Sequence, residues 1–300
     1  MSNFDDIEDI FDETVDDITP TSTENFKYGI TIEKYTGSEK IVEIPAEFNG
    51  IPVTKIGEDA FCGCPSLTEI KIPEGVTEIG DSAFFGCASL TEIKIPEGVT
   101  KIGARTFEEC YRLTDIEIPE GITEIGECAF ALCSHLKEIK IPEGVTKIGD
   151  SAFFGCTSLT EIKIPESVTE IGEYAFAGWT VDDYDIDADY AYTTVYGMDL
   201  EEIDIPNNVI KIGERGFQYC TELTEIKIPD SVKIIGASAF YNCTSLTEIK
   251  IPDSVKIIGD DIVKNCENLQ RVYINTSKWS YADIKRIFGK NPKFEILPLE

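Results

Sequence analysis

The sequence predicts a repeat solenoid, in which short parallel strands stack along one axis. Leucines recur every 23 residues from Leu67 to Leu159, and again from Leu200 to Leu269. The interval between the two series is 41 residues, which is one period plus 18. No single unit of this length buries its own apolar face, whereas a stack of units does. We therefore predict a right-handed superhelix of short parallel strands joined by brief helical turns, with one insertion.

Each unit begins with a short strand. In the T-E-I-K-I segment, Ile70 and Ile72 lie two residues apart and share the buried face. Glu69 and Lys71 share the hydrated face, and Pro73 ends the strand because it has no N–H for a ladder. The pattern predicts ten such strands, centred near Val42, Ile70, Ile93, Ile116, Ile139, Ile162, Ile203, Ile226, Ile249 and Val272.

The remainder of each unit closes the coil. Val76 and Ile79 are expected to point inward, and Gly80 to allow a turn. Phe84 and Cys87 follow in a brief helical turn that completes the core. Along the hydrated strand face, one row is almost entirely acidic and the next is largely lysine. We expect these two rows to neutralise each other approximately.

Cysteine occupies one position of the repeat in most units. We interpret this column as small buried thiols packed behind phenylalanine, because free cysteine behaves as a small hydrophobe. Neither Cys62 with Cys64 nor Cys128 with Cys133 has zinc-site spacing, so we predict no metal and no cofactor. Buried thiols favour a reducing compartment. The eight cysteines of the column are Cys64, Cys87, Cys110, Cys133, Cys156, Cys220, Cys243 and Cys266.

The charge and the N-terminal segment restrict the classes of partner. A formal net charge of −30 argues against nucleic acid and anionic membranes, because both would repel the chain. No apolar run approaches the roughly 20 residues of a transmembrane helix. The first residues lack the basic and apolar regions of a signal peptide, which favours a cytoplasmic location.

The acidic N-terminal arm has an apolar pattern of its own. Residues 1–25 carry nine acidic groups and no basic one. This arm is either an acidic amphipathic motif that folds on a partner or a solvated tail. Its apolar residues, at helical spacing, are Phe4, Ile7, Ile10, Phe11, Val15 and Ile18.

The repeated I-P-x-x-V-x-x-I-G-x-x-A-F-x-x-C signature resembles the BspA-like, or Treponema-type, leucine-rich repeat family. The resemblance extends from about residue 41 to residue 275. It implies contact with other proteins, adhesin-like or scaffolding, and it brings no catalytic residue. It also gives the cell surface or secretion as the alternative location.

Catalytic motifs are absent from the sequence. His135 is the only histidine, at a loop position, so a two-histidine metal site is impossible and a catalytic triad has one candidate. There is no P-loop and no G-x-G-x-x-G motif. We predict a non-enzymatic protein-binding module. A passive spacer or surface-layer element is the alternative, and a hydrolase or other enzyme is a distant one.

The candidate contact residues are those that break the monotony of the repeat. In the insertion at 180–199 these are Tyr184, Tyr190, Tyr192, Tyr196, Asp185, Asp187 and Asp189. Tyrosine is a favoured contact residue, and aspartate attracts a basic partner. A solvated loop, a protein contact and a cation site all remain open for this segment. Arg271 and Tyr273 break the pattern of the last strand.

Four regions follow from these patterns. The acidic arm covers residues 1–25, and a first coil or cap covers 26–56. The 23-residue repeats cover 57–275, with the insertion at 180–199. A helix–strand cap covers 276–300, with its helix beginning at Ser280.

Overall fold

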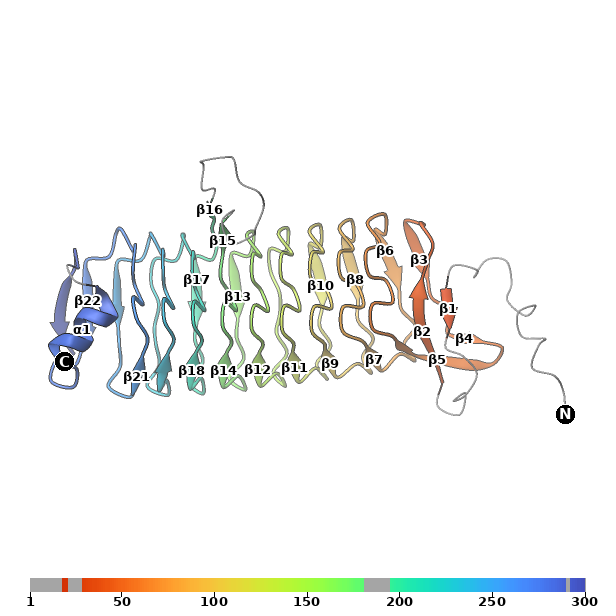
Figure 1. The fold of residues 1–300 in the computed structure, drawn as a ribbon. Helices are drawn as coiled ribbons and strands as arrows, with labels where there is room; N and C mark the ends of the chain where they lie inside the picture. The colour runs from red at the N-terminus through yellow and green to blue at the C-terminus, as the bar shows by residue number, and fades with distance from the viewer. Residues whose placement is uncertain (1–17, 21–28, 181–194, 290–291, 300) are drawn as a thin grey trace.

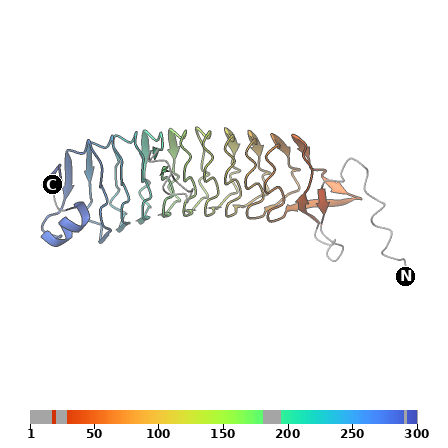
Figure 2. The ribbon, with the colours of Figure 1, turned by 45° about the horizontal axis from the view of Figure 1, so that its top comes forward.

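A computed structural model shows an elongated stack of coils, with β1 (Ile18–Pro20) and α1 (Tyr281–Phe288) at opposite ends (Figure 1). The structure describes residues 18–20, 29–180, 195–289 and 292–299. Turning the molecule shows the same single stack from a second side (Figure 2). The predicted solenoid of short parallel strands is confirmed.

The T-E-I-K-I segments form a parallel ladder, which we call the front ladder. Isoleucine pairs with isoleucine across it, as in Ile70↔Ile93 and Ile93↔Ile116. The units near Ile139 and Ile226 contribute isolated bridges in place of strands. The strands of the front ladder are β3 (Ile41–Glu43), β6 (Glu69–Lys71), β8 (Glu92–Lys94), β10 (Asp115–Glu117), β13 (Glu161–Lys163), β17 (Glu202–Asp204), β20 (Glu248–Lys250), β22 (Arg271–Ile274) and β23 (Glu295–Pro298).

A second parallel ladder, the back ladder, was not anticipated from the sequence. It forms at the residues directly before the glycine that recurs once in each unit, such as Glu78 and Ile79 before Gly80. It is again in register, as in Ile125↔Ile148. Its strands are β5 (Ile51–Ile56), β7 (Glu78–Ile79), β9 (Lys101–Ile102), β11 (Glu124–Ile125), β12 (Lys147–Ile148), β14 (Glu170–Ile171), β18 (Lys211–Ile212), β19 (Ile234–Ile235) and β21 (Ile257–Ile258).

The segment predicted as a brief helical turn forms tight turns instead. Ser82 has φ 54° and Gly86 has φ 68°, and these left-handed conformations interrupt a right-handed helix. The turns are closed by Phe85 N donating to Ser82 O at 3.0 Å and Cys87 N donating to Phe84 O at 3.1 Å. The coils are also joined here, because Phe84 N donates to the carbonyl of Thr106 in the next coil.

The glycine before each turn has a different role from the one predicted. Gly149 does not have a positive φ, so it is not required for a left-handed turn. A Cβ placed on Gly149 would lie 2.6 Å from the backbone carbonyl carbon of Gly126 in the preceding coil. Glycine is therefore needed here because the backbones of neighbouring coils approach too closely for any side chain.

Phenylalanine and cysteine columns form the core beneath the turns. The rings from Phe61 to Phe240 stack coil upon coil, with neighbouring centroids 5.4 to 5.7 Å apart. The thiols from Cys87 to Cys266 are buried, as predicted, whereas Cys64 at the start of the column is half-buried. Each of these seven buried thiols donates to the phenylalanine carbonyl of the preceding coil at 3.1 to 3.3 Å. Cysteine thus fills apolar space and also supplies a weak donor.

Buried thiols of this column should react slowly with thiol reagents. Burial raises the pKa of Cys110 and of Cys156 to about 12, so at pH 8 almost no reactive thiolate is present. In native protein treated with iodoacetamide and analysed by peptide mass spectrometry, we expect Cys62, which is exposed, to be modified first. Modification of the seven buried thiols of the column before the protein unfolds would contradict their burial.

Both ends of the stack are covered by additional elements. β1 (Ile18–Pro20) pairs antiparallel with β2 (Ile30–Tyr35), and β4 (Glu47–Phe48) pairs antiparallel with β5. The helix expected after Ser280 is α1 (Tyr281–Phe288). Ser280 and Asp283 form its capping box. The Ile287 carbonyl accepts from Ile262 N at 3.0 Å, so α1 covers the last turn of the stack.

Candidate binding face

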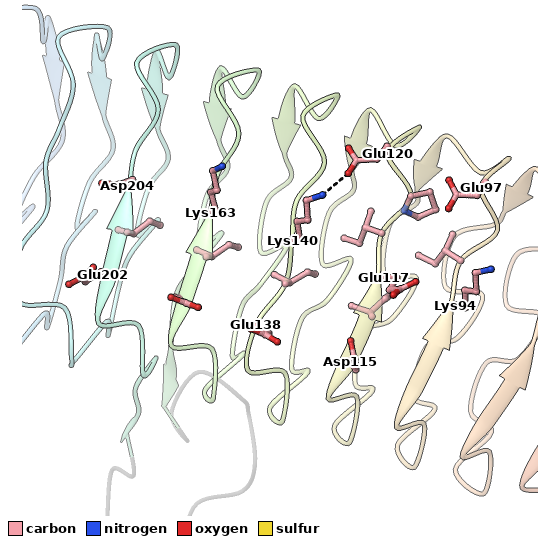
Figure 3. Close-up of a pocket in the computed structure, with 18 of the residues that line it drawn as sticks. Lys94, Glu97, Asp115, Glu117, Glu120, Glu138, Lys140, Lys163, Glu202 and Asp204 are labelled. Atoms are coloured by element: carbon pink, nitrogen blue, oxygen red, sulfur yellow. Dashed lines mark hydrogen bonds and ion pairs between the residues drawn. The ribbon is translucent and has the colours of Figure 1, made fainter.

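A shallow groove of about 1040 Å³ runs across several coils of the front ladder. Its floor is formed by the exposed side chains of β8, β10, β13 and β17, and one wall by the loops after the strands (Figure 3). Nine carboxylates and four lysines line it, so the groove is acidic. It is open and charged, unlike the enclosed apolar cavities that hold small cofactors.

One row of the front ladder, which we call the acidic row, consists of stacked carboxylates, and its central members line the groove. Its members occupy the first strand position in successive coils, where backbone pairing places like charges in register, as in Glu69↔Glu92 and Glu161↔Glu202. Like charges directly opposite each other destabilise a sheet. Of this row, only Glu248 forms an ion pair among the described residues. The acidic row is Glu69, Glu92, Asp115, Glu138, Glu161, Glu202, Glu225 and Glu248.

The neighbouring lysines do not neutralise the acidic row, contrary to the expectation from sequence. Lys94 Nζ lies 2.8 Å from Glu74 Oε1, and Lys140 Nζ lies 2.6 Å from Glu120 Oε1, both in the loops after the strands. The hydrogen bond that Lys94 donates lowers the pKa of Glu74, and the hydrogen bond that Lys140 donates to Glu120 raises the pKa of Lys140. Lys94 and Lys140 therefore stabilise the loop carboxylates, and they form no ion pair with the acidic row.

The back ladder shows the opposite arrangement of charge. Its exposed first positions alternate in sign from coil to coil: Lys55, Glu78, Lys101, Glu124, Lys147, Glu170, Lys211. Lys101 Nζ lies 3.4 Å from Glu124, and Lys211 Nζ lies 2.8 Å from Glu170. The same chain thus pairs its charges on one face and stacks like charges on the other. A reading of the sequence in steps of 23 residues at this position would have found the alternation.

Arg271 and Tyr273 both lie on β22, at the C-terminal end of the front ladder, as their spacing predicted. Arg271 is engaged within the chain, because its guanidinium lies 2.8 Å from Glu248 Oε2. Tyr273 pairs in register with Lys250 and is partly exposed. The two residues therefore end the two rows of the front ladder, with a cation after the acidic row and an aromatic ring after the lysine-rich one.

The base of the insertion is a small hairpin of β15 (Trp179–Thr180) and β16 (Val195–Tyr196). Tyr196 stacks on Trp179 with ring centroids 4.3 Å apart, so one of its faces is occupied by the chain itself. It is nevertheless 41% exposed. The other predicted contact residues of the insertion, Tyr184, Tyr190, Tyr192, Asp185, Asp187 and Asp189, lie outside the described residues.

No group of three or more potential metal ligands comes together within the part of the chain that the structure describes. In the same residues, no helix has the length and apolar character needed to cross a bilayer. His135 is exposed, and its Nδ1 lies 2.7 Å from the carbonyl oxygen of Tyr111. The acidic groove is therefore the candidate contact surface that we consider.

The two in-register ladders and their shared core define a parallel β-solenoid of the repeat-protein class. The family described as "BspA type Leucine rich repeat region" matches residues 54–181 and 189–286, in six copies. The chain belongs to this family, as its signature indicated. A comparison with curated proteins finds no match.

Solved structures of bacterial leucine-rich repeat proteins are similar to this chain. One from Bacteroides ovatus has 26% identity and a TM-score of 0.51, and the match covers 96% of this chain and 100% of that one. The T. pallidum leucine-rich repeat protein has 25% identity and a TM-score of 0.56, over 80% of this chain and 90% of that one. The pneumococcal vaccine antigen PcpA has 18% identity and a TM-score of 0.52, and the match covers 95% of this chain and 84% of that one. At this identity the similarity shows the fold alone.

Proposed function

We propose that this protein is a non-enzymatic binding module whose front groove binds a basic segment of a partner protein. The observation that carries the proposal is the acidic row, in which like charges stack in register and only Glu248, at its end, forms an ion pair among the described residues. The back ladder shows that this repeat accommodates alternating charge, so the fold does not require the stacked row. An arrangement that costs stability is expected where it serves binding.

The groove also matches the geometry of an extended partner. Neighbouring carboxylates are one coil apart, about 5 Å, so an extended basic segment along the stack can contact several of them. Such contacts are partly exposed, and their attraction should be weakened by salt. The partly exposed Tyr273 would add specificity at the end of the front ladder, and the tyrosines predicted in the insertion at 180–199 are further candidate contacts.

The proposal is tested by removing charge from the groove. We expect the variant Glu92→Gln, Asp115→Asn, Glu138→Gln, Glu161→Gln to bind a fluorescein-labelled lysine–serine repeat peptide roughly 10- to 30-fold more weakly by anisotropy. Its thermal midpoint should be equal to or higher than that of the unmodified protein, because like-charge repulsion is relieved.

A matched control separates the groove from net charge. Glu58, Glu127, Glu173 and Glu214 are exposed, lie in the turns away from the front ladder, and lose the same total charge when replaced by glutamine. This control should change peptide affinity by less than roughly threefold. Equal losses in the two variants, or no binding to the unmodified protein, would favour a passive spacer instead.

A further inference from the structure

The C-terminal end of the back ladder breaks the alternation of charge. Where earlier coils present threonine followed by lysine or glutamate, the last three present Ile210 with Lys211, Lys233 with Ile234, and Lys256 with Ile257. We call Ile210, Ile234, Ile257, Lys233 and Lys256 the back patch.

The residues of the back patch are contiguous. Ile234 pairs in register with Ile257, and Ile234 N donates to the Ile210 carbonyl at 3.3 Å. Ile210 is 50% exposed and Ile257 is 57% exposed, both high values for isoleucine on a regular strand surface. A single exposed isoleucine is ordinary, but two exposed isoleucines joined by the partly exposed Ile234, beside lysines, are typical of an interaction surface.

The lysines of the back patch are available for a partner. Lys233 Nζ donates to the backbone carbonyl of Asp230, and neither Lys233 nor Lys256 forms an ion pair among the described residues. The nearby carboxylates of Asp230 and Asp253 lie in the loops before these lysines and do not pair with them. In a chain of net charge −30, such a surface calls for a partner that is both apolar and acidic.

The chain contains a segment with this chemistry, which is its own N-terminal arm. Residues 1–17 carry eight acidic groups and no basic one. The apolar residues among them, which include Phe4, Ile7, Ile10 and Phe11, recur at helical spacing. An amphipathic acidic segment can place its apolar side on the isoleucines and its carboxylates beside the lysines.

The arm cannot reach the back patch of the same molecule. It leaves the fold at β1, whose neighbours in succession are β2, β5, β7, β9, β11, β12, β14 and β18. At about 4.8 Å per neighbouring strand, the back patch begins on the order of 40 Å from β1. Phe11 is seven residues before Ile18, so a fully extended linker brings it no farther than about 25 Å, and a helix from Phe4 to Phe11 adds only about 10 Å. In its helical form the arm therefore falls short of the back patch. Figure 1 shows the same separation between β1 and β18 or β21.

We propose that the back patch binds the acidic N-terminal arm of a second copy of this chain. The arm is attached at β1, and β1 and the back patch lie toward opposite ends of the solenoid, so the contact is head-to-tail and heterologous. Each assembly then retains one unused arm at one end and one unused back patch at the other, so association continues as concentration rises. The front groove remains separate from this contact.

The test uses the full-length chain and a fluorescein-labelled peptide of residues 1–17, with reductant present because Cys62 is exposed. We expect saturable binding that weakens with salt. The variant Ile210→Glu, Ile257→Glu should lower peptide affinity at least roughly tenfold. The control Thr100→Glu, Thr146→Glu adds the same charge at exposed back-face positions of other coils, and should lower it less than roughly twofold.

Sedimentation of the unlabelled chains gives an independent readout. The unmodified chain should form larger species as its concentration rises, and the Ile210→Glu, Ile257→Glu variant should stay monomeric over the same range. A peptide in which Phe4, Ile7, Ile10 and Phe11 are serine should not compete. A monomeric unmodified chain, or equal peptide binding by the two variants, would overturn the proposal.

Discussion

Replacing Phe84 by alanine should destabilise the protein by about 3–5 kcal/mol. Phe84 is fully buried, and its ring lies between those of Phe61 and Phe107, with both centroid distances 5.5 Å. The substitution removes two stacking contacts and leaves a void that the flanking coils cannot fill without separating. Because each coil is stabilised mainly by its neighbours, the loss should extend to adjacent coils.

Urea unfolding followed by circular dichroism measures this effect, and the adjacent phenylalanine is its control. Phe85 is only partly buried, and the Arg105 guanidinium lies 4.6 Å from its ring centroid. Phe85→Ala should cost about 1 kcal/mol, from a lost cation–π contact and modest burial. Equal effects of the two substitutions would show that the assignment of inward and outward positions is wrong.

Adding one methyl group at Gly149 should destabilise the protein by about 3 kcal/mol or more. Its Cβ would lie 2.6 Å from the carbonyl carbon and oxygen of Gly126 and 2.7 Å from Glu127 N, all of them backbone atoms. Backbone cannot rotate away as a flexible side chain can, so the two coils must move apart. That movement would weaken the hydrogen bonds of the back ladder on both sides of Gly149.

Another glycine of the repeat provides the matched control. A Cβ on Gly121 would meet its nearest neighbours, two carbonyl oxygens, at 3.6 Å, which is ordinary contact. Gly121→Ala should therefore be neutral or stabilise by up to about 1 kcal/mol, by restricting the unfolded chain. Thermal unfolding of both variants gives the comparison. Tolerance of Gly149→Ala would mean that neighbouring coils are not in close backbone contact.

Under the proposed function, the two faces of the solenoid differ in how their charges affect stability and binding. Alternating charge on the back ladder stabilises neighbouring coils, as Lys211 with Glu170 shows. The acidic row does the reverse, and its lysine neighbours contact loop carboxylates such as Glu74. Neutralising the acidic row therefore separates two roles: it should favour folding and weaken binding.

The contact residues predicted from sequence were found by searching for departures from the repeat. This search identified Arg271 and Tyr273, which the structure places at the end of the front ladder. It did not identify the acidic row, because that row is the most regular feature of the sequence. It also missed the back patch, although the change from V-T-K-I-G to V-K-I-I-G, which places Ile234 on the surface, is visible in the sequence. Under the proposed function, the binding face is the acidic row, which is the most regular feature of the sequence and does not depart from the repeat.

Residue type and spacing were enough to predict the solenoid, its period and the residues buried in its core. Period and burial are properties of residue type and spacing: apolar residues such as Leu90 and Phe84 repeat together and must leave water together. The tertiary structure alone decided which atoms of neighbouring coils meet. That contact made Gly149 a spacing residue and replaced the expected helical turn near Ser82 by tight turns. It also left the acidic row, apart from Glu248, without ion pairs among the described residues. The physical reason is that residues 23 positions apart become neighbours about 5 Å apart only after the chain has wound a full turn.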